Sequence, residues 1–144
     1  MNALIELTDQ AISADAVVAR LSDPAIGAVV TFIGVVRGVT AGRATSHLEY
    51  EAYPEMAIKT LQQIADEVRM RWTDVREVAI VHRVGHLDVG ETAIVIALSA
   101  AHREQTFDAL HYAIDRIKEI APIWKKEIWQ SDASSYDAEW RSTQ

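Results

Sequence analysis

The sequence predicts an α+β fold, and three observations lead to this class. Segments with the alternation or β-branched content of strands are mixed with segments of helical periodicity. The two kinds do not follow the strict strand–helix–strand order of a parallel α/β sheet. The 144 residues contain no internal repeat, low-complexity run or Pro/Gly/Ser-rich linker. We therefore expect a single domain over residues 1–144, with a mixed or antiparallel sheet and about three helices.

The N-terminal part of the chain predicts a strand, a helix and a second strand. A short strand is expected over residues 3–7. Ser13 can cap a helix over about 14–22, which the break at Asp23-Pro24 ends. Residues 27–36 are β-branched and almost continuously hydrophobic, which is typical of a strand buried on both faces.

The middle of the chain predicts a loop, a half-buried strand and a helix. The glycine-bearing segment 37–43 is expected to be a loop. Polar and apolar residues then alternate over 47–52, as in a strand with one face in water. Pro54 suits the first turn of a helix, and apolar residues at helical spacing extend this helix to about Trp72.

The C-terminal half predicts two strands, a long helix and a last short strand. Pro122 is expected to end the helix, because proline cannot continue one. The expected elements, in chain order, are a strand over 75–84, a turn region over 85–91, a strand over 92–100, a helix over roughly 103–120 and a strand over 123–129.

Composition excludes several classes of function. The net charge of −7 and the pI near 5.1 disfavour a general binder of nucleic acid or anionic membranes. The lack of cysteine excludes a disulfide framework, a thiolate zinc site and an iron–sulfur cluster. The N-terminus has no basic and apolar signal pattern, and no run of 18 apolar residues occurs. We expect a soluble cytoplasmic protein.

A basic segment near the C-terminus is the first candidate for chemistry. Three of the four lysines, Lys118, Lys125 and Lys126, fall within ten residues. In one interpretation Lys118 complements the dipole at the end of a helix and the other two are solvated. In the other, the ammonium groups lower one another's pKa, so that one transfers protons or acts as a nucleophile while the others bind an anion. If 123–129 is a strand, Lys125 and Lys126 point to opposite faces, so only one can join Lys118.

Two further cationic positions have the same two interpretations. His102 and Arg103 stand at the expected start of the long helix, where cations oppose the helix dipole unless an anion is bound there. The alternative is a surface pair that Glu104 compensates. Arg37 follows a hydrophobic strand and precedes a glycine, which suits either a functional residue at a strand end or a simple strand terminator.

Other polar clusters are weaker. On a strand, His82 and His86 would lie about 13 Å apart, too far to share a metal ion. His47, Glu49 and Glu51 alternate along one strand and are interpreted as a solvated face. The glycines match no nucleotide-binding pattern. We expect no metal site.

Five segments occur in a fixed order at residues 27–37, 48–53, 81–85, 99–103 and 118–127. Together they resemble the large, catalytic subunit family of molybdopterin synthase, the MoaE family. The resemblance covers about residues 25–130 and implies an α/β-hammerhead-like fold, a homodimer at the centre of a heterotetramer, and no resident cofactor. It also implies a sulfurtransferase of molybdenum cofactor biosynthesis, which converts cyclic pyranopterin monophosphate (precursor Z) to molybdopterin. The sulfur would come from the C-terminal Gly-Gly thiocarboxylate of a ubiquitin-like small subunit.

The resemblance also implies the site residues. Lys118 matches the family's essential lysine and Lys125 its second lysine, so both are expected to be catalytic and to bind substrate. The tail departs from the family pattern, which leaves Arg141 as only a possible pocket residue. The remaining expected substrate-binding positions are Val35, Val36, Arg37, His102, Arg103, Lys126 and Glu127.

Two properties of the residues bear on this interpretation. A sulfur-inserting enzyme without cysteine must receive its sulfur from an external donor. His102 and Lys118 are 16 residues apart, or about 24 Å along one helix, so we hypothesise that one pocket combines them from two protomers. The alternative function is a non-catalytic dimeric module that binds a ubiquitin-like tail and an anionic ligand.

Overall fold

The chain, described by a computed structural model over residues 3–130 and 136–142, folds into two sheets and three helices. In chain order the elements are β1 (Ala3–Thr8), α1 (Ala14–Ala19), β2 (Ala28–Val35), β3 (Val39–Thr40), β4 (Arg43–Ala52), α2 (Pro54–Arg71), β5 (Val75–Arg83), β6 (Gly85–Asp88), β7 (Thr92–Ala100), α3 (Thr106–Ile120), β8 (Ile123–Gln130) and β9 (Tyr136–Ser142).

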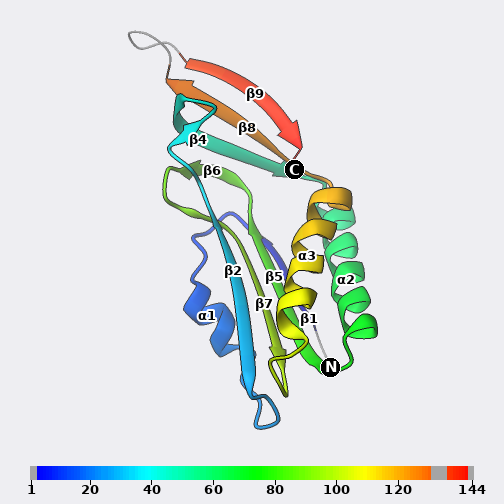
Figure 1. Cartoon of the computed structure of the whole chain (residues 1–144). Helices are drawn as coiled ribbons and strands as arrows, with labels where there is room; N and C mark the ends of the chain where they lie inside the picture. The colour runs from blue at the N-terminus through cyan, green and yellow to red at the C-terminus, as the bar shows by residue number, and fades with distance from the viewer. Residues whose placement is uncertain (1–2, 131–135, 143–144) are drawn as a thin grey trace.

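The first sheet has the strand order β1-β5-β7-β2 (Figure 1). β1 pairs with β5 in parallel, whereas β5–β7 and β7–β2 are antiparallel. The sheet is therefore mixed, as the sequence predicts. Its two central strands, β5 and β7, are long and hydrophobic because helices cover both of their faces.

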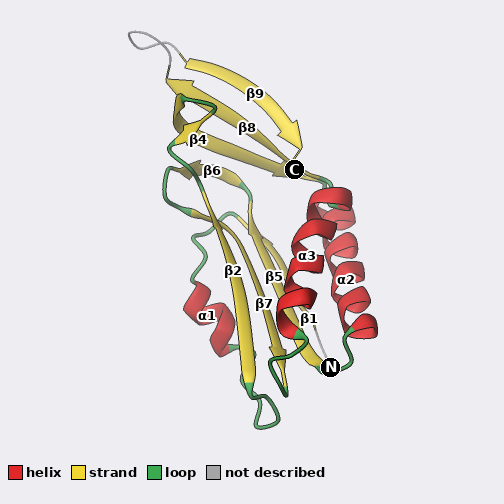
Figure 2. Ribbon diagram, in the orientation of Figure 1, coloured by secondary structure: helices red, strands yellow, loops and turns green. Residues whose placement is uncertain are grey.

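Helices α2 and α3 pack side by side on one face of this sheet, and α1 lies on the other (Figure 2). The alternation of strand side chains divides β5 between the two layers. Val78 and Ile80 join the core beneath α2 and α3, whereas Ala79 and Val81 pack with α1. Ser13 caps α1 as expected, because its Oγ accepts a hydrogen bond from the Ala16 amide at 3.2 Å.

The second sheet has the order β3-β4-β8-β9, with β6 also paired to β4. β6 belongs to the connection between β5 and β7, so this connection reaches from the first sheet into the second (Figure 1). A small buried cluster of Val36, Leu48, Leu87 and Ala93 fills the junction between the two sheets. The junction matters for function because the end of β2 and the end of α3 lie beside it (Figure 1).

The expectation that residues 27–36 form a strand buried on both faces is wrong. β2 is an edge strand of the first sheet, and Val29, Ile33 and Val35 on one of its faces are 37–54% exposed. A continuous apolar run predicts a strand but not whether its second face is covered. α1 packs against β5 and β7 and leaves this face of β2 open.

Three local expectations also need correction. The long helix begins at Thr106 rather than 103, so His102 and Arg103 lie in a turn before it. The expected turn region 85–91 contains strand β6, and the expected loop 37–43 contains the two-residue strand β3. Short strands of this kind form because a partner strand offers hydrogen bonds, which a local pattern does not reveal. Among the described residues, no helix is both long and apolar enough to cross a membrane.

Candidate functional site

A cavity of about 470 Å³ lies where the end of β2, the last turns of α3 and the second sheet meet. Three of its lining residues are cations from separate segments: Arg37 follows β2, Lys118 is in the last turn of α3, and Lys125 is on β8. The fold thus gathers positive charge at one place in a chain of net charge −7. The full lining is Phe32, Ile33, Gly34, Val35, Arg37, Tyr50, His82, Ala93, Ile94, Ile96, Ile114, Ile117, Lys118 and Lys125.

Local structure explains why Lys118 and Lys125 share this cavity. Ile117 is buried in the core, and Lys118 follows it at the exposed rim in the last turn of α3. Lys118 therefore also complements the helix dipole, as the first interpretation of the basic segment held. Pro122 follows the helix, and the chain continues directly into β8.

The strand pairing sets the orientation of Lys125. β8 is antiparallel to β4 and places Lys125 directly opposite Tyr50, and both residues line the cavity. Lys126 is opposite Glu49 and does not line the cavity. The prediction that only one of the two lysines can join Lys118 is confirmed.

A buried acid stands next to Lys125. The Glu127 side chain is only 2% exposed, and its Oε1 is 3.6 Å from the Lys125 Nζ, whereas Oε2 is buried without a hydrogen bond. A buried carboxylate is costly unless a cation is near, so the pair fixes Lys125 at the cavity wall. The pKa of Tyr50 is raised, first by burial and second by the charge of Glu127. Tyr50 therefore remains a neutral phenol at physiological pH.

His82 is a further polar group of the cavity wall. Its ring lies edge-on to Tyr50, with centroids 4.9 Å apart, and its Nδ1 donates to the Arg83 carbonyl at 2.7 Å. Burial lowers the pKa of His82 to about 4, so the ring is neutral at pH 7 and keeps a lone pair on Nε2. Sequence reasoning did not single out Tyr50 or His82 as site residues. Both lie within the segments that resemble the family, which was the available signal.

The structure does not bring His102 and Arg103 to this cavity. They lie in the turn between β7 and α3, at the opposite end of the helix from Lys118. The His102 amide donates to Asp74 Oδ2 at 2.8 Å, and its ring Nδ1 is 3.4 Å from Asp74 Oδ1. The carboxylate that contacts His102 is therefore that of Asp74 rather than that of Glu104. His102 and Asp74 line a separate concavity of about 360 Å³.

The other expected site residues occupy different environments. Val35 lines the cavity, whereas Val36 is 3% exposed and packs in the junction core. The register of β9 on β8 aligns Arg141 with Lys125 along the backbone. The Arg141 side chain lies outside the described part of the structure, so its expected place in the pocket stays a prediction.

Comparison with known proteins identifies the family. The sequence matches the family model described as "MoaE protein" over residues 7–120. This protein belongs to the MoaE family. It is 49% identical to the molybdopterin synthase catalytic subunit of Halalkalibacterium halodurans over 124 residues, which cover 86% of this chain and 79% of that one. It is 47% identical to the Bacillus subtilis protein of the same name over 125 residues, covering 87% and 79% of the two chains.

Solved structures agree with this assignment. The crystal structure of molybdopterin synthase from Staphylococcus aureus matches with a TM-score of 0.86 and 43% identity, over 94% of this chain and 95% of that one. A chain from the complex of subunits 1 and 2 of the Helicobacter pylori molybdopterin-converting factor matches with a TM-score of 0.72 and 17% identity, over 85% and 83% of the chains. The second match bears on the fold alone.

The family and the fold class predicted from the sequence are confirmed. The expectation of an enzyme of molybdenum cofactor biosynthesis, a molybdopterin synthase catalytic subunit, is also confirmed by these relatives. The roles of individual residues stay predictions.

Proposed function

We propose that this protein installs the two dithiolene sulfurs of molybdopterin on cyclic pyranopterin monophosphate. The observation that carries the proposal is the cavity in which Arg37, Lys118 and Lys125 meet. The substrate phosphate, the carboxyl terminus of a sulfur-carrier protein and the oxyanions that develop during acyl transfer are all negative. Cations held in place by a fold stabilise such charges without reorganisation.

Lys118 is the proposed catalytic residue. It lines the cavity from the last turn of a helix whose preceding residue, Ile117, is anchored in the core. An amine at this position can exchange a proton with the substrate or form a transient covalent bond. Both roles require a titrating amine and a fixed position.

Lys125 is the proposed contact for the thiocarboxylate tail of the partner. Its ammonium group has the buried carboxylate of Glu127 at 3.6 Å, which restrains it at the wall of the cavity. Glu127 accordingly acts on the reaction through Lys125. Arg37 on the neighbouring wall offers a guanidinium fork, which suits phosphate or carboxylate.

The sulfur donor is proposed to be a ubiquitin-like small subunit with a C-terminal Gly-Gly thiocarboxylate. This protein has no cysteine, so no thiolate of its own can carry the sulfur. The Helicobacter pylori chain of the same fold is part of a complex of subunits 1 and 2 of the molybdopterin-converting factor. We expect a heterotetramer with two copies of this chain at its centre.

His102 and Arg103 are proposed to complete the pocket of a second protomer. From Thr106 to Lys118 the axis of α3 rises about 18 Å, and the turn that carries His102 lies beyond Thr106. One small substrate cannot contact both ends within a single chain. The open face of the edge strand β2 carries exposed Val29, Ile33 and Val35, which makes this strand the proposed contact between protomers.

Reconstitution tests the proposal. The purified chain is incubated with thiocarboxylated small subunit and cyclic pyranopterin monophosphate, and the dithiolene product is followed. We expect product that depends on all three components, and none when the small subunit carries an ordinary carboxylate. Binding of both ligands without product would contradict the catalytic proposal and favour a non-catalytic module.

A further inference from the structure

A cluster of metal-binding side chains lies on the second sheet, outside the cavity. His47 and Glu49 are two residues apart on β4, and His86 and Asp88 are two residues apart on β6. The antiparallel register pairs Glu49 with His86 and His47 with Asp88. Residues two apart on a strand, and residues directly opposite across a ladder, share one face. The four side chains therefore stand together on one face of the β4–β6 ribbon.

The ligand atoms of three of these residues are close. One nitrogen of His47, one of His86 and a carboxylate oxygen of Glu49 all lie within 4.8 Å of one another. The two imidazole rings stack with centroids 4.2 Å apart, and the His47 Nε2 is 3.9 Å from Glu49 Oε1. The side chains of His47, Glu49 and His86 are 21%, 43% and 54% exposed, so an ion can reach them from solvent.

The sequence led us to expect no metal site, because it did not show that His86 lies beside His47 and Glu49. We propose that these three residues bind a divalent transition-metal cation, for which Zn²⁺ is the best fit. Two imidazoles and one carboxylate are a common zinc ligand set that leaves a position for water. Imidazole favours zinc, nickel and copper, whereas magnesium and calcium prefer oxygen ligands. With bonds of about 2.1 Å, tetrahedral ligand atoms stand roughly 3.4 Å apart. Small rotations of these partly exposed side chains reach that spacing.

The neighbours of the two histidines suit this role. The Ser46 hydroxyl is 3.1 Å from the His47 Nδ1. When the hydroxyl accepts from Nδ1–H, the lone pair of Nε2 faces Glu49. A hydrogen bond of this kind to the second nitrogen orients metal-binding histidines in general. Asp88 Oδ1 is 2.8 Å from the His86 Nε2, so Asp88 orients the His86 ring by the same kind of hydrogen bond.

One charge opposes the ion. Lys126 on β8 is directly opposite Glu49 in the ladder, so its ammonium group belongs to the same face. A cation on the same face lowers the affinity of the three side chains for a metal cation. The geometry therefore predicts that removal of the Lys126 charge strengthens metal binding, whereas removal of His47 or His86 weakens it.

The site is separate from the proposed catalytic cavity. Tyr50, which lines the cavity, alternates with Glu49 along β4 and points to the opposite face. The ion would join β4 to β6, the short strand that links the first sheet to the second. A ligand that binds only the folded state stabilises it, so Zn²⁺ should raise the midpoint of thermal unfolding.

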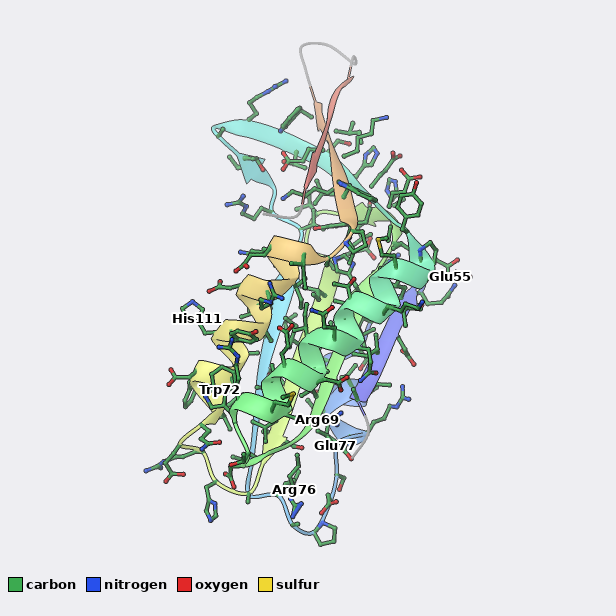
Figure 3. All side chains as sticks on the ribbon, turned by 90° about the vertical axis from the view of Figure 1, so that its right-hand side faces the viewer. Glu55, Arg69, Trp72, Arg76, Glu77 and His111 are labelled. Atoms are coloured by element: carbon green, nitrogen blue, oxygen red, sulfur yellow. The ribbon has the colours of Figure 1, made fainter. Side chains whose placement is uncertain are left out.

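The test is calorimetric titration of the full chain with ZnCl₂, compared with His47→Gln and His86→Gln. We expect one Zn²⁺ per chain, with each substitution weakening the affinity by roughly 10- to 100-fold or more. The matched control is His111→Gln. His111 lies on α3 (Figure 3) and is 77% exposed, and its Nε2 is 3.3 Å from Asp115 Oδ2. The control should leave the affinity unchanged, and Lys126→Gln should increase it several-fold.

Two results would overturn the proposal. The first is no saturable binding of Zn²⁺ to the wild-type chain. The second is binding that His47→Gln and His86→Gln leave intact or that His111→Gln removes, which identifies an ion adventitiously held by surface groups. Far-ultraviolet circular dichroism of each metal-free variant checks the fold. If one histidine variant does not fold, Glu49→Gln replaces it. The visible spectrum of the Co²⁺-loaded wild type is then also measured. A spectrum of octahedral Co²⁺ bound only to water would contradict the proposed site.

Discussion

The two ends of helix α3 carry similar residue types in opposite settings. At the C-terminal end, Lys118 faces a cavity that it shares with Lys125 and Arg37. At the N-terminal end, His102 is held by Asp74 through its amide and its ring. The first end has cations in excess over anions, whereas the second is compensated within the chain. The difference indicates that only the C-terminal end is ready to receive a small anion within one protomer.

The contrast between the two ends also defines what a second protomer would add. The Asp74 carboxylate accepts from the His102 amide at 2.8 Å and therefore fixes the turn that carries His102 and Arg103. That turn is held by a hydrogen bond and lies at the other end of α3 from the cavity of its own chain. A turn held in this way suits residues that act in the site of a neighbouring protomer, as proposed for His102 and Arg103.

The largest expected effect is at Lys118. We expect Lys118→Ala to lower the rate of product formation by roughly 10²- to 10⁴-fold, the range for loss of a general acid or base. Lys118→Arg should fail similarly, because guanidinium does not deprotonate. The assay is single-turnover formation of the dithiolene product, with circular dichroism as the control for folding. Near-normal turnover in Lys118→Ala would show that Lys118 is not the catalytic residue.

The second prediction tests whether the two ends act in different protomers. Lys118→Ala and His102→Ala chains are each expected to be inactive. After subunit exchange of equal amounts, about half of the dimers are heterodimers, and one of the two sites in each heterodimer is intact. The mixture should therefore recover about one quarter of wild-type activity. Exchange is verified by mass spectrometry of differently tagged chains. Failure to recover activity in verified heterodimers would rule out a shared site.

The third prediction concerns His82 at the cavity end. Burial lowers the pKa of His82 to about 4 from its ordinary value near 6.5. Between these values the unfolded chain binds a proton that the folded chain does not, so the free energy of unfolding falls as the pH drops from 6.5 to 4. The loss from this group reaches roughly 3 kcal/mol at pH 4.

Urea unfolding from pH 7 to 4 checks this prediction, with His82→Asn as the variant. The asparagine side chain can still donate a hydrogen bond to the Arg83 carbonyl but does not titrate in this range. The stability of the variant should fall less steeply with decreasing pH than that of the wild type. Parallel curves for the two proteins would show that His82 is not the group responsible.

The smallest effect is expected at Gly27, beside the turn that carries His102. A Cβ atom at this position would lie 2.5 Å from the Ala101 carbonyl oxygen, while the Gly27 amide donates to the Ala100 carbonyl at 2.9 Å. Gly27→Ala must displace backbone and should lower the free energy of unfolding by about 1–3 kcal/mol.

The matched control for this substitution is Gly38→Ala, near the cavity end. There the nearest atom to an added Cβ is the Val89 Cγ1 at 3.3 Å, which belongs to a side chain that can move. Chemical denaturation of both variants gives the comparison. An equal loss of stability in Gly27→Ala and Gly38→Ala would mean that the close approach of the added Cβ to the Ala101 carbonyl is not what destabilises Gly27→Ala.

The sequence predicted most elements because their signals are local. Ser13 capped α1, Pro54 opened α2, and α3 ended before Pro122, each within a few residues of the expected bounds. The sequence did not predict strands β6 and β3, because each is short and depends on pairing with β4. The exposed face of β2 was unpredictable for a related reason: coverage by a helix is a property of packing and not of the strand.

The candidate site divides in the same way. Lys118 and Lys125 were recognisable as part of a concentration of lysines, and Arg37 as a cation at a strand end. The family resemblance also pointed to all three. Strand alternation predicted that only one of Lys125 and Lys126 can join Lys118, and the pairing of β8 with β4 decides that it is Lys125. The meeting of these residues with Arg37 in one cavity is a property of the tertiary structure. His82 became a wall of the cavity only because β5 places it edge-on to Tyr50.

By itself the sequence determined the family, the class of fold and the chemical types available: amines and guanidinium groups, and no thiol. These are set by residue identity and by short-range periodicity. The tertiary structure alone decided which groups are neighbours. It brought Arg37 to the same cavity as Lys118 and Lys125. It also placed His47 on β4 beside His86 on β6, although helix α2 and strand β5 lie between them in the chain. Hydrogen-bonded register between distant strands fixes such contacts, and no local pattern encodes it.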